Sequence, residues 1–180
     1  MASIYMQMVM TMGTKQKGLF TMRKFKGLAM GLAVAVISMS AAARAQMQPQ
    51  IYDVNADAKA EISAAIKTAH AEHKRVLLDF GGNWCGDCIV LDRNFHMPEN
   101  QALLNSDYVV VHVDIGKFDK NMDIAQRYGI PLEKGVPALA VIDGMGKLIF
   151  AQTKGEFEAM RRMDPSSVHE FLEQWKAKKS

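Results

Sequence analysis

The 180-residue sequence has only two cysteines, and its first 45 residues contain no aspartate or glutamate. Because the two cysteines, Cys85 and Cys88, are all there are, no second pair can complete a four-cysteine zinc site, and no third thiol competes for either partner. Of the five histidines only His70 and His73 lie close together, and they precede the cysteines at what the pattern indicates is a helix end. No tract of repeats or low complexity is present.

The acid-free start of the chain has the layout of an export signal. Residues 22–26 are rich in basic side chains, residues 27–40 are apolar, and residues 43–45 (Ala-Arg-Ala) place small side chains where a signal peptidase reads them. We therefore expect residues 1–45 to be a signal peptide that is cleaved after Ala45. Because Met22 is a conventional start, we expect residues 1–21 to be an over-long gene prediction.

An uncleaved membrane anchor is the competing interpretation of this segment. Its apolar part is short for a bilayer crossing, which takes about 20 residues, and the small-residue site that follows favours cleavage. Export would place the protein in the periplasm, an oxidising compartment in which an exposed pair of thiols needs a function.

Residues 46–180 would then form one domain large enough for an ordinary core. Six of the 22 basic residues belong to the first 45, so 16 basic residues remain against 19 acidic ones, a net charge of −3 where the whole chain has +3. The basic character therefore belongs to the export signal, and we expect no nucleic-acid partner.

The two cysteines form a Cys-Gly-Asp-Cys motif that follows an apolar run, 76–80, predicted to be a buried strand. A thiolate at the start of a helix is stabilised by unpaired backbone N–H groups and the helix dipole, which makes it nucleophilic. The spacing lets the second thiol attack a mixed disulfide formed on the first. Half of a zinc site and an inert disulfide are the alternatives, and so short a loop restricts the unfolded chain little.

Hydrophobic periodicity predicts alternating strands and helices along the rest of the chain. We expect an α/β fold, with one mixed central sheet and helices on both of its faces. The valine-rich stretch 108–115 is predicted to be a second central strand, and 138–142 with 147–151 to be an antiparallel hairpin. Helices are expected over 55–73, 85–95, 98–104 and 121–128, and after Asp164-Pro165, which is expected to cap the last one.

Three separated features of this sequence resemble the thioredoxin superfamily. Residues 78–80 with 84–88 resemble the passage from strand to active site, Asp79 matches the family's buried carboxylate, and residues 135–137 (Gly-Val-Pro) resemble the segment with its cis-proline. The export signal and the sequence of residues 80–84 (Phe-Gly-Gly-Asn-Trp) extend the resemblance to exported thioredoxin-like proteins, including the C-terminal domain of DsbD-type reductases. The chain departs from thioredoxin at Asp87 and at the insertion 131–134.

The catalytic residues expected from the chemistry and the resemblance are Cys85, Cys88 and Asp79. Cys85 is the candidate nucleophile at the helix start, and Cys88, one turn further, the shielded resolving thiol. An unpaired carboxylate in an apolar strand favours its protonated form, so Asp79 is a candidate to take the proton of Cys88. A salt-bridged or edge-facing strand residue is the structural alternative.

The expected substrate-binding residues are Trp84, Val136 and Pro137. Trp84 lies beside the nucleophile and is a candidate to shape the surface there, with simple packing as the alternative. The resemblance implies that a cis bond at Pro137 leaves the preceding backbone groups free to pair with an extended substrate. His112 lies in the strand expected to neighbour the Asp79 strand, where one interpretation is that it faces that carboxylate. A satisfied strand histidine is the preferred interpretation, so His112 is not among the expected catalytic residues.

These features favour a periplasmic thiol–disulfide oxidoreductase that reduces or exchanges protein disulfides. We expect a monomer without cofactor or metal, whose partners are protein thiols and disulfides and a membrane electron donor of the DsbD type. Asp87 should disfavour the thiolates while the helix terminus favours them. A thioredoxin-fold chaperone or metal carrier is the alternative from another class. A thiol peroxidase is disfavoured, because threonine is absent from residues 83–94.

Overall fold

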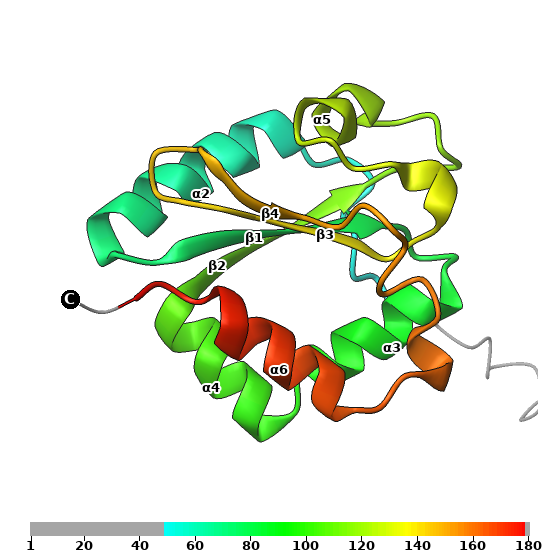
Figure 1. Cartoon of the computed structure of the whole chain (residues 1–180). Coiled ribbons are helices and arrows are strands. Elements are labelled where there is room, and N and C mark those ends of the chain that lie inside the picture. The colour runs from blue at the N-terminus through cyan, green and yellow to red at the C-terminus, as the bar shows by residue number, and fades with distance from the viewer. Residues whose placement is uncertain (1–48, 179–180) are drawn as a thin grey trace, which may run out of the picture. The chain divides into compact units, whose positions relative to one another are not determined.

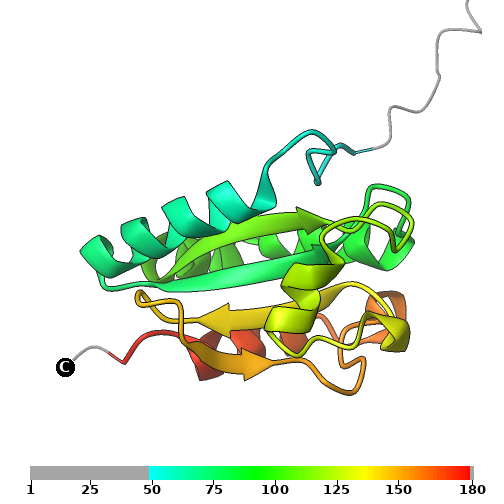
Figure 2. The same ribbon diagram turned by 90° about the horizontal axis from the view of Figure 1, so that it is seen from above.

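The computed structural model describes residues 49–178, so the signal peptide expected at residues 1–45 lies outside the described part of the chain. In that part, four strands form one mixed sheet, and helices cover both of its faces (Figures 1 and 2). The predicted fold class is confirmed.

The sheet has the strand order β2-β1-β3-β4. β1 pairs in parallel with β2 and antiparallel with β3, and β3 pairs antiparallel with β4, which confirms the predicted hairpin. The strands are β1 (Arg75–Gly81), β2 (Tyr108–Asp114), β3 (Ala138–Ile142) and β4 (Leu148–Ala151).

The prediction that the valine-rich strand is central is wrong. β2 is at the edge of the sheet and has β1 as its neighbour, while β1 and β3 are the central strands. Three of its seven residues are only half-buried, Val109, Val110 and His112, whereas every residue of β1 after Arg75 is buried. Valine content reflects strand propensity and therefore does not distinguish an edge strand from a central one.

The helices follow the predicted order, with boundaries that differ by a few residues. Asp57 caps the first of them, since its carboxylate accepts hydrogen bonds from the backbone N–H groups of Lys59 and Ala60. The helices are α2 (Ala58–Glu72), α3 (Gly86–Phe95), α4 (Pro98–Asp107), α5 (Met122–Arg127) and α6 (Ser166–Trp175), with short 3-10 helices η1 (Leu132–Lys134) and η2 (Met160–Arg162).

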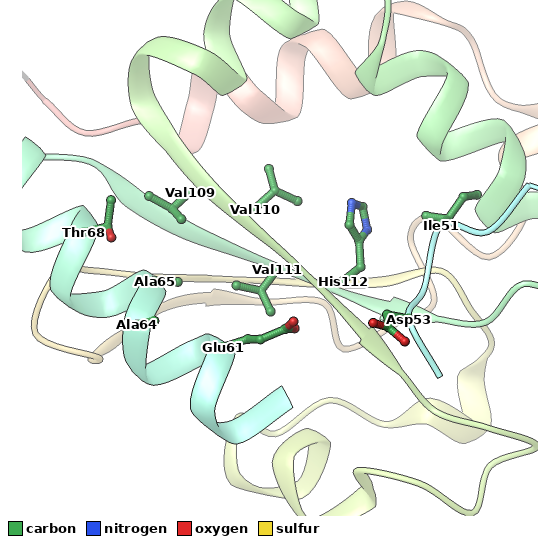
Figure 3. Close-up of a pocket in the computed structure, with 10 residues that line it drawn as sticks. All are labelled: Ile51, Asp53, Glu61, Ala64, Ala65, Thr68, Val109, Val110, Val111 and His112. Atoms are coloured by element: carbon green, nitrogen blue, oxygen red, sulfur yellow. The ribbon is translucent and has the colours of Figure 1, made fainter. Parts of the chain in front are cut away.

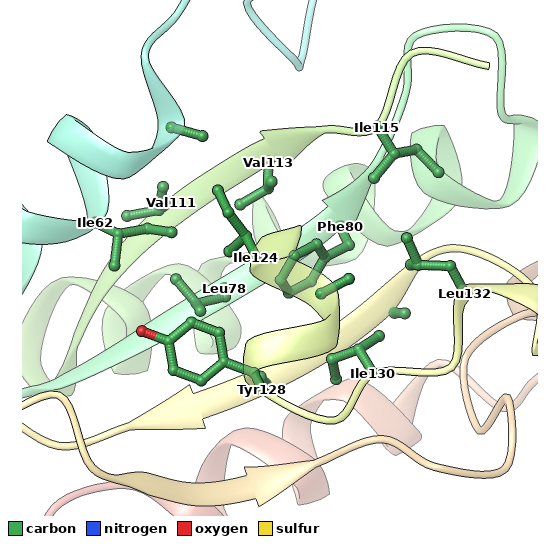
Figure 4. Close-up of a cluster of buried hydrophobic side chains, with 14 of the residues drawn as sticks. Ile62, Leu78, Phe80, Val111, Val113, Ile115, Ile124, Tyr128, Ile130 and Leu132 are labelled. Atoms are coloured by element: carbon green, nitrogen blue, oxygen red, sulfur yellow. The ribbon is translucent and has the colours of Figure 1, made fainter. Parts of the chain in front are cut away.

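Two apolar clusters lie on opposite faces of the sheet, because successive strand residues point to opposite sides. Leu78 and Phe80 of β1 pack under α2 and α5, in the cluster drawn in Figure 4. Leu77 belongs to the other cluster, with Leu91 of α3 and Leu172 of α6. Asp79, two residues after Leu77, therefore points toward the face that α3 covers.

Among residues 49–178, no helix combines the length and the apolar character that crossing a membrane requires.

Candidate active site

The two cysteines lie where β1 turns into α3, and they form a disulfide with their Cα atoms 5.2 Å apart. A tight turn, in which the Cys85 N–H donates to the carbonyl of Gly82, brings Cys85 to the cap position of α3. Its sulfur accepts the backbone N–H of Cys88 at 3.0 Å. Cys85 is 5% exposed and Cys88 is fully buried. Cys88 is thus the more enclosed of the two, and Cys85 is the one that solvent reaches.

Trp84 is 41% exposed beside this disulfide and is held by the loop that follows β2. Its indole N–H donates to the carbonyl of Gly116 at 2.6 Å. The ammonium of Lys117 lies 4.7 Å from the ring centroid of Trp84, and the Phe118 ring, itself 44% exposed, lies 5.7 Å from it. The structure therefore gives Trp84 two neighbours that the sequence did not single out, and together they form an exposed aromatic surface.

Val136 and Pro137 approach the cysteines from the start of β3. The Val136–Pro137 peptide bond is cis, as expected. The carbonyl oxygen of Val136 lies 3.5 Å from the sulfur of Cys85. The structure thus brings residues 51 positions apart in the sequence to the same side of the disulfide.

Asp79 is 1% exposed, as expected, but it has partners. Its Oδ2 atom accepts the Tyr52 hydroxyl at 2.9 Å and lies 2.9 Å from Nδ1 of His112, while Oδ1 is buried without a hydrogen-bond partner among the described residues. The expectation of an unpaired carboxylate is therefore wrong. The reason is topological: parallel pairing places His112 directly beside Asp79, and the segment before α2 brings in Tyr52.

Burial and the negative charge of Asp79 shift the pKa values of its two partners, Tyr52 and His112. Burial, together with the charge and hydrogen bond of Asp79, raises the pKa of Tyr52 well above its ordinary value. Burial alone would lower the pKa of His112, but the hydrogen bond and charge of Asp79 outweigh it, so the pKa of His112 is raised. Near neutral pH, Tyr52 is thus held in its neutral form, ready to donate.

Asp87, inside the Cys-Gly-Asp-Cys motif, is paired with Arg161 from η2. The Arg161 guanidinium donates to both carboxylate oxygens, with its shortest contact at 2.9 Å, and the Arg161 backbone N–H donates to Oδ1 at 2.9 Å. Partial burial alone would raise the pKa of Asp87, but these hydrogen bonds and the positive charge lower it. The sequence expectation treated Asp87 as an uncompensated charge, and the structure supplies the cation that compensates it.

A cleft of about 420 Å³ lies between α2 and the edge strand β2 (Figure 3). His112 lines this cleft and also contacts Asp79, so it connects the buried carboxylate to the surface. Within residues 49–178, no group of three or more His, Cys, Asp or Glu side chains is arranged to hold a metal ion.

Comparison with known proteins agrees with this geometry. A family model described as thioredoxin-like matches residues 57–144. The solved structure of a disulphide isomerase from Xylella fastidiosa Temecula1 is 35% identical in sequence, with a TM-score of 0.66, over 69% of this chain and 95% of that one. The chain belongs to the thioredoxin-like family.

Two other solved structures match less well. A DsbH oxidoreductase is 24% identical over 51% of this chain and 68% of that one, with a TM-score of 0.43. A thioredoxin from Thermus thermophilus is 19% identical over 62% and 81%, with a TM-score of 0.47. None of the curated proteins compared with the chain matches it. Tyr52 and Arg161 both lie outside the stretch that the thioredoxin-like model matches.

The Asp87–Arg161 pair is expected to tune the nucleophile of this thioredoxin-like site. Arg161→Ala leaves the Asp87 carboxylate uncompensated beside the thiols, so alkylation of reduced Cys85 near pH 7 should slow by about two- to fivefold, the range of an exposed ion pair. Asp87→Asn should accelerate alkylation, and the double variant should return close to the wild-type rate. The effect should shrink at high salt. Equal rates in all four proteins at low salt would show that the pair does not influence Cys85.

Proposed function

We propose that this protein is an exported thiol–disulfide oxidoreductase that reduces or exchanges disulfides of protein substrates through Cys85 and Cys88. The observation that carries the proposal is the position of the Cys85 sulfur, which caps α3, accepts the N–H of Cys88 and closes a disulfide with it. The likeness to a protein named a disulphide isomerase supports the same chemistry.

In the reduced protein, the Cys85 thiolate attacks one sulfur of a substrate disulfide. A bond forms between Cys85 and that sulfur, and the other substrate sulfur leaves as a thiolate that takes a proton from water. The N-terminus of α3 favours the attacking thiolate, because its unpaired N–H groups and its dipole stabilise negative charge there. Cys88 then attacks the Cys85 sulfur, which restores the internal disulfide and releases the second substrate thiol.

Substrate binding falls to the groups that surround Cys85. The Val136 carbonyl, 3.5 Å from the sulfur, is an acceptor for a backbone N–H of an extended substrate that lies across the site at Pro137. Trp84 provides an apolar surface next to it, and the Phe118 ring widens that surface. These roles require no cofactor.

The reducing direction is favoured over a dedicated oxidase. Between β2 and β3 the chain has only the six-residue α5 and the 3-10 helix η1, without a long helical insertion. A reductant in the periplasm needs a supply of electrons, and a membrane reductase of the DsbD type is the proposed donor. We propose that the protein acts as a monomer.

The equilibrium redox potential of the Cys85–Cys88 pair tests this proposal. A value near the roughly −270 mV of thioredoxin is expected for a reductant, whereas a value near about −120 mV would indicate an oxidant. The measurement equilibrates the protein with glutathione buffers and counts its free thiols. A pair that does not equilibrate with glutathione at all would contradict thiol–disulfide exchange in either direction.

Export should remove the first 45 residues. Protein purified from the periplasm is expected to begin at Gln46, because residues 43–45 end the apolar segment with a signal-peptidase site. Mass spectrometry of the intact protein checks this. A chain that starts at Met1 or Met22 and stays with the membrane fraction would contradict it.

A further inference from the structure

The Tyr52 hydroxyl contacts the buried carboxylate and lies near the resolving cysteine. It donates to Asp79 Oδ2 at 2.9 Å. The same hydroxyl lies beside Gly81. A Cβ atom added at Gly81 would collide with this hydroxyl, and it would lie 2.6 Å from Tyr52 Cζ and 2.8 Å from the Cys88 sulfur. Glycine at position 81 therefore allows both the hydroxyl and the sulfur to pack against the same point of the β1 backbone.

The position of Tyr52 is fixed by the active-site loop itself. The Asn83 side chain accepts the backbone N–H of Tyr52 at 3.0 Å and donates to its carbonyl at 2.8 Å. The Tyr52 side chain is fully buried, and its ring meets the His112 ring edge-on with centroids 5.6 Å apart. A tyrosine from the segment before α2 is thus held by the active-site loop close to Cys88.

We propose that Tyr52 relays the proton of Cys88 to Asp79 when Cys88 resolves the mixed disulfide, with His112 positioning the carboxylate. This inference rests on the proposed function. As Cys88 attacks the sulfur of Cys85, its S–H proton passes to the Tyr52 oxygen while the Tyr52 hydroxyl proton passes to Asp79. The Cys85–Cys88 bond forms, the bond from Cys85 to the substrate breaks, and the departing thiolate takes a proton from water.

Asp79 keeps the proton until an external dithiol donor reduces the disulfide. The bond between the two cysteines then breaks, the Cys88 thiolate leaves, and it recovers the proton from Asp79 along the same path. Protons and electrons balance over the cycle without a further reactant. The proton arrives on Asp79 Oδ2, the atom that accepts the Tyr52 hydroxyl, and the neutral carboxyl then donates it back to the Tyr52 oxygen across the same contact.

His112 holds Asp79 Oδ2 from the neighbouring strand and makes the relay sensitive to pH. Burial would lower the pKa of His112, but the hydrogen bond and charge of Asp79 raise it, so the charge next to the acceptor oxygen changes with pH. The titratable and charged groups that face His112 are Tyr52, Asp53, Glu61, Asp79, Asp92, Asp114 and Lys120.

The test uses a symmetrical aryl disulfide whose thiol is coloured, mixed with the reduced protein in a stopped-flow instrument. Attack by Cys85 releases the first coloured thiol, and resolution by Cys88 releases the second, so one trace reports both steps. Tyr52→Phe removes only the hydroxyl. It should slow the second release by about tenfold or more near neutral pH, as loss of a positioned proton-transfer group does, and leave the first release nearly unchanged.

The pH profile separates a relay from a structural role. In Tyr52→Phe the second release should rise steeply with pH, because Cys88 must then ionise to bulk solvent, whereas the wild type should depend on pH more weakly. Tyr128→Phe is the matched control, since Tyr128 is also buried in the cluster under α2 and α5 and is not among the groups that contact Asp79. An unchanged second release in Tyr52→Phe, or equal slowing in Tyr128→Phe, would overturn the relay.

Two further measurements on the wild type keep the outcomes distinct. In D2O the second release should slow by more than the first, and equal isotope effects on both steps would contradict proton transfer during resolution. A wild-type trace that shows the first release without the second would instead contradict the proposed dithiol function.

The role of His112 is tested with His112→Asn. This side chain keeps a donor beside Asp79 but cannot titrate, so the substitution should flatten the pH profile of the second release. An unaltered profile would remove His112 from the relay.

Discussion

Cys85→Ser is expected to abolish the reduction of insulin and of model disulfides, whereas Cys88→Ser is expected to accumulate a mixed disulfide with its substrate. The structure gives the reason for this asymmetry. The Cys85 sulfur caps α3 and retains some exposure, while the Cys88 sulfur is fully buried against the sheet. We therefore expect a substrate disulfide to react with Cys85, and Cys88 to resolve the product.

Non-reducing gels and mass spectrometry of Cys88→Ser after incubation with a substrate should show one substrate chain per protein. The Cys85→Ser protein is the control and should trap none. Equal trapping by both variants, or trapping by Cys85→Ser alone, would reverse the assigned order of attack.

Asp79→Asn is expected to slow the resolution step by about 100-fold near neutral pH, with a smaller effect on the first attack. The asparagine keeps the size of the side chain but cannot take up a proton, and loss of a positioned base costs about that much or more. The same aryl-disulfide trace measures both steps. Normal resolution by Asp79→Asn would remove the carboxylate from the mechanism.

The same substitution is also expected to lower the free energy of unfolding, by about 1–3 kcal/mol near pH 6, because Asp79 has two hydrogen-bonded partners. The loss should depend on pH. Asp79 raises the pKa of His112 above its unfolded value, so this stabilisation is complete below about pH 6.5 and is lost as the pH rises through the folded pKa. Urea unfolding at a series of pH values should show the difference between wild type and Asp79→Asn shrinking from about pH 6 to 9. A constant difference would mean that His112 does not titrate against Asp79.

Much of the fold follows from local sequence signals, because each element has its own. The glycine pair at the end of β1, Pro98 at the start of α4 and the turn residues 143–146 all mark boundaries that the structure confirms. Strand order is different, since it depends on pairing between distant segments. The run of valines in β2 is compatible with a central or an edge position, and only the assembled sheet distinguishes them.

The site was predictable where its residues are neighbours in sequence or carry a motif. The cysteines, Trp84 and Pro137 lie where the motifs place them. Tyr52 and Arg161 lie outside any motif, and their roles come from contacts across 27 and 74 positions of the chain. The contact of His112 with Asp79 was partly predictable, because adjacent parallel strands place residues of the two strands side by side. The sequence of β2 alone does not determine which residue of β1 lies beside His112.

The bonds of Asn83 to residues 51 and 52 determine how far the chain can be shortened. A protein cut to begin at residue 57, where the family match starts, would keep β1 to β4 and both cysteines. It would also lose Tyr52, leave the Asn83 amide without these backbone partners, and open a tyrosine-sized void beneath the disulfide. Such a fragment should fold and still form the disulfide, yet close it slowly after each attack. We therefore expect the smallest fully active unit to start several residues before the stretch that the family model matches.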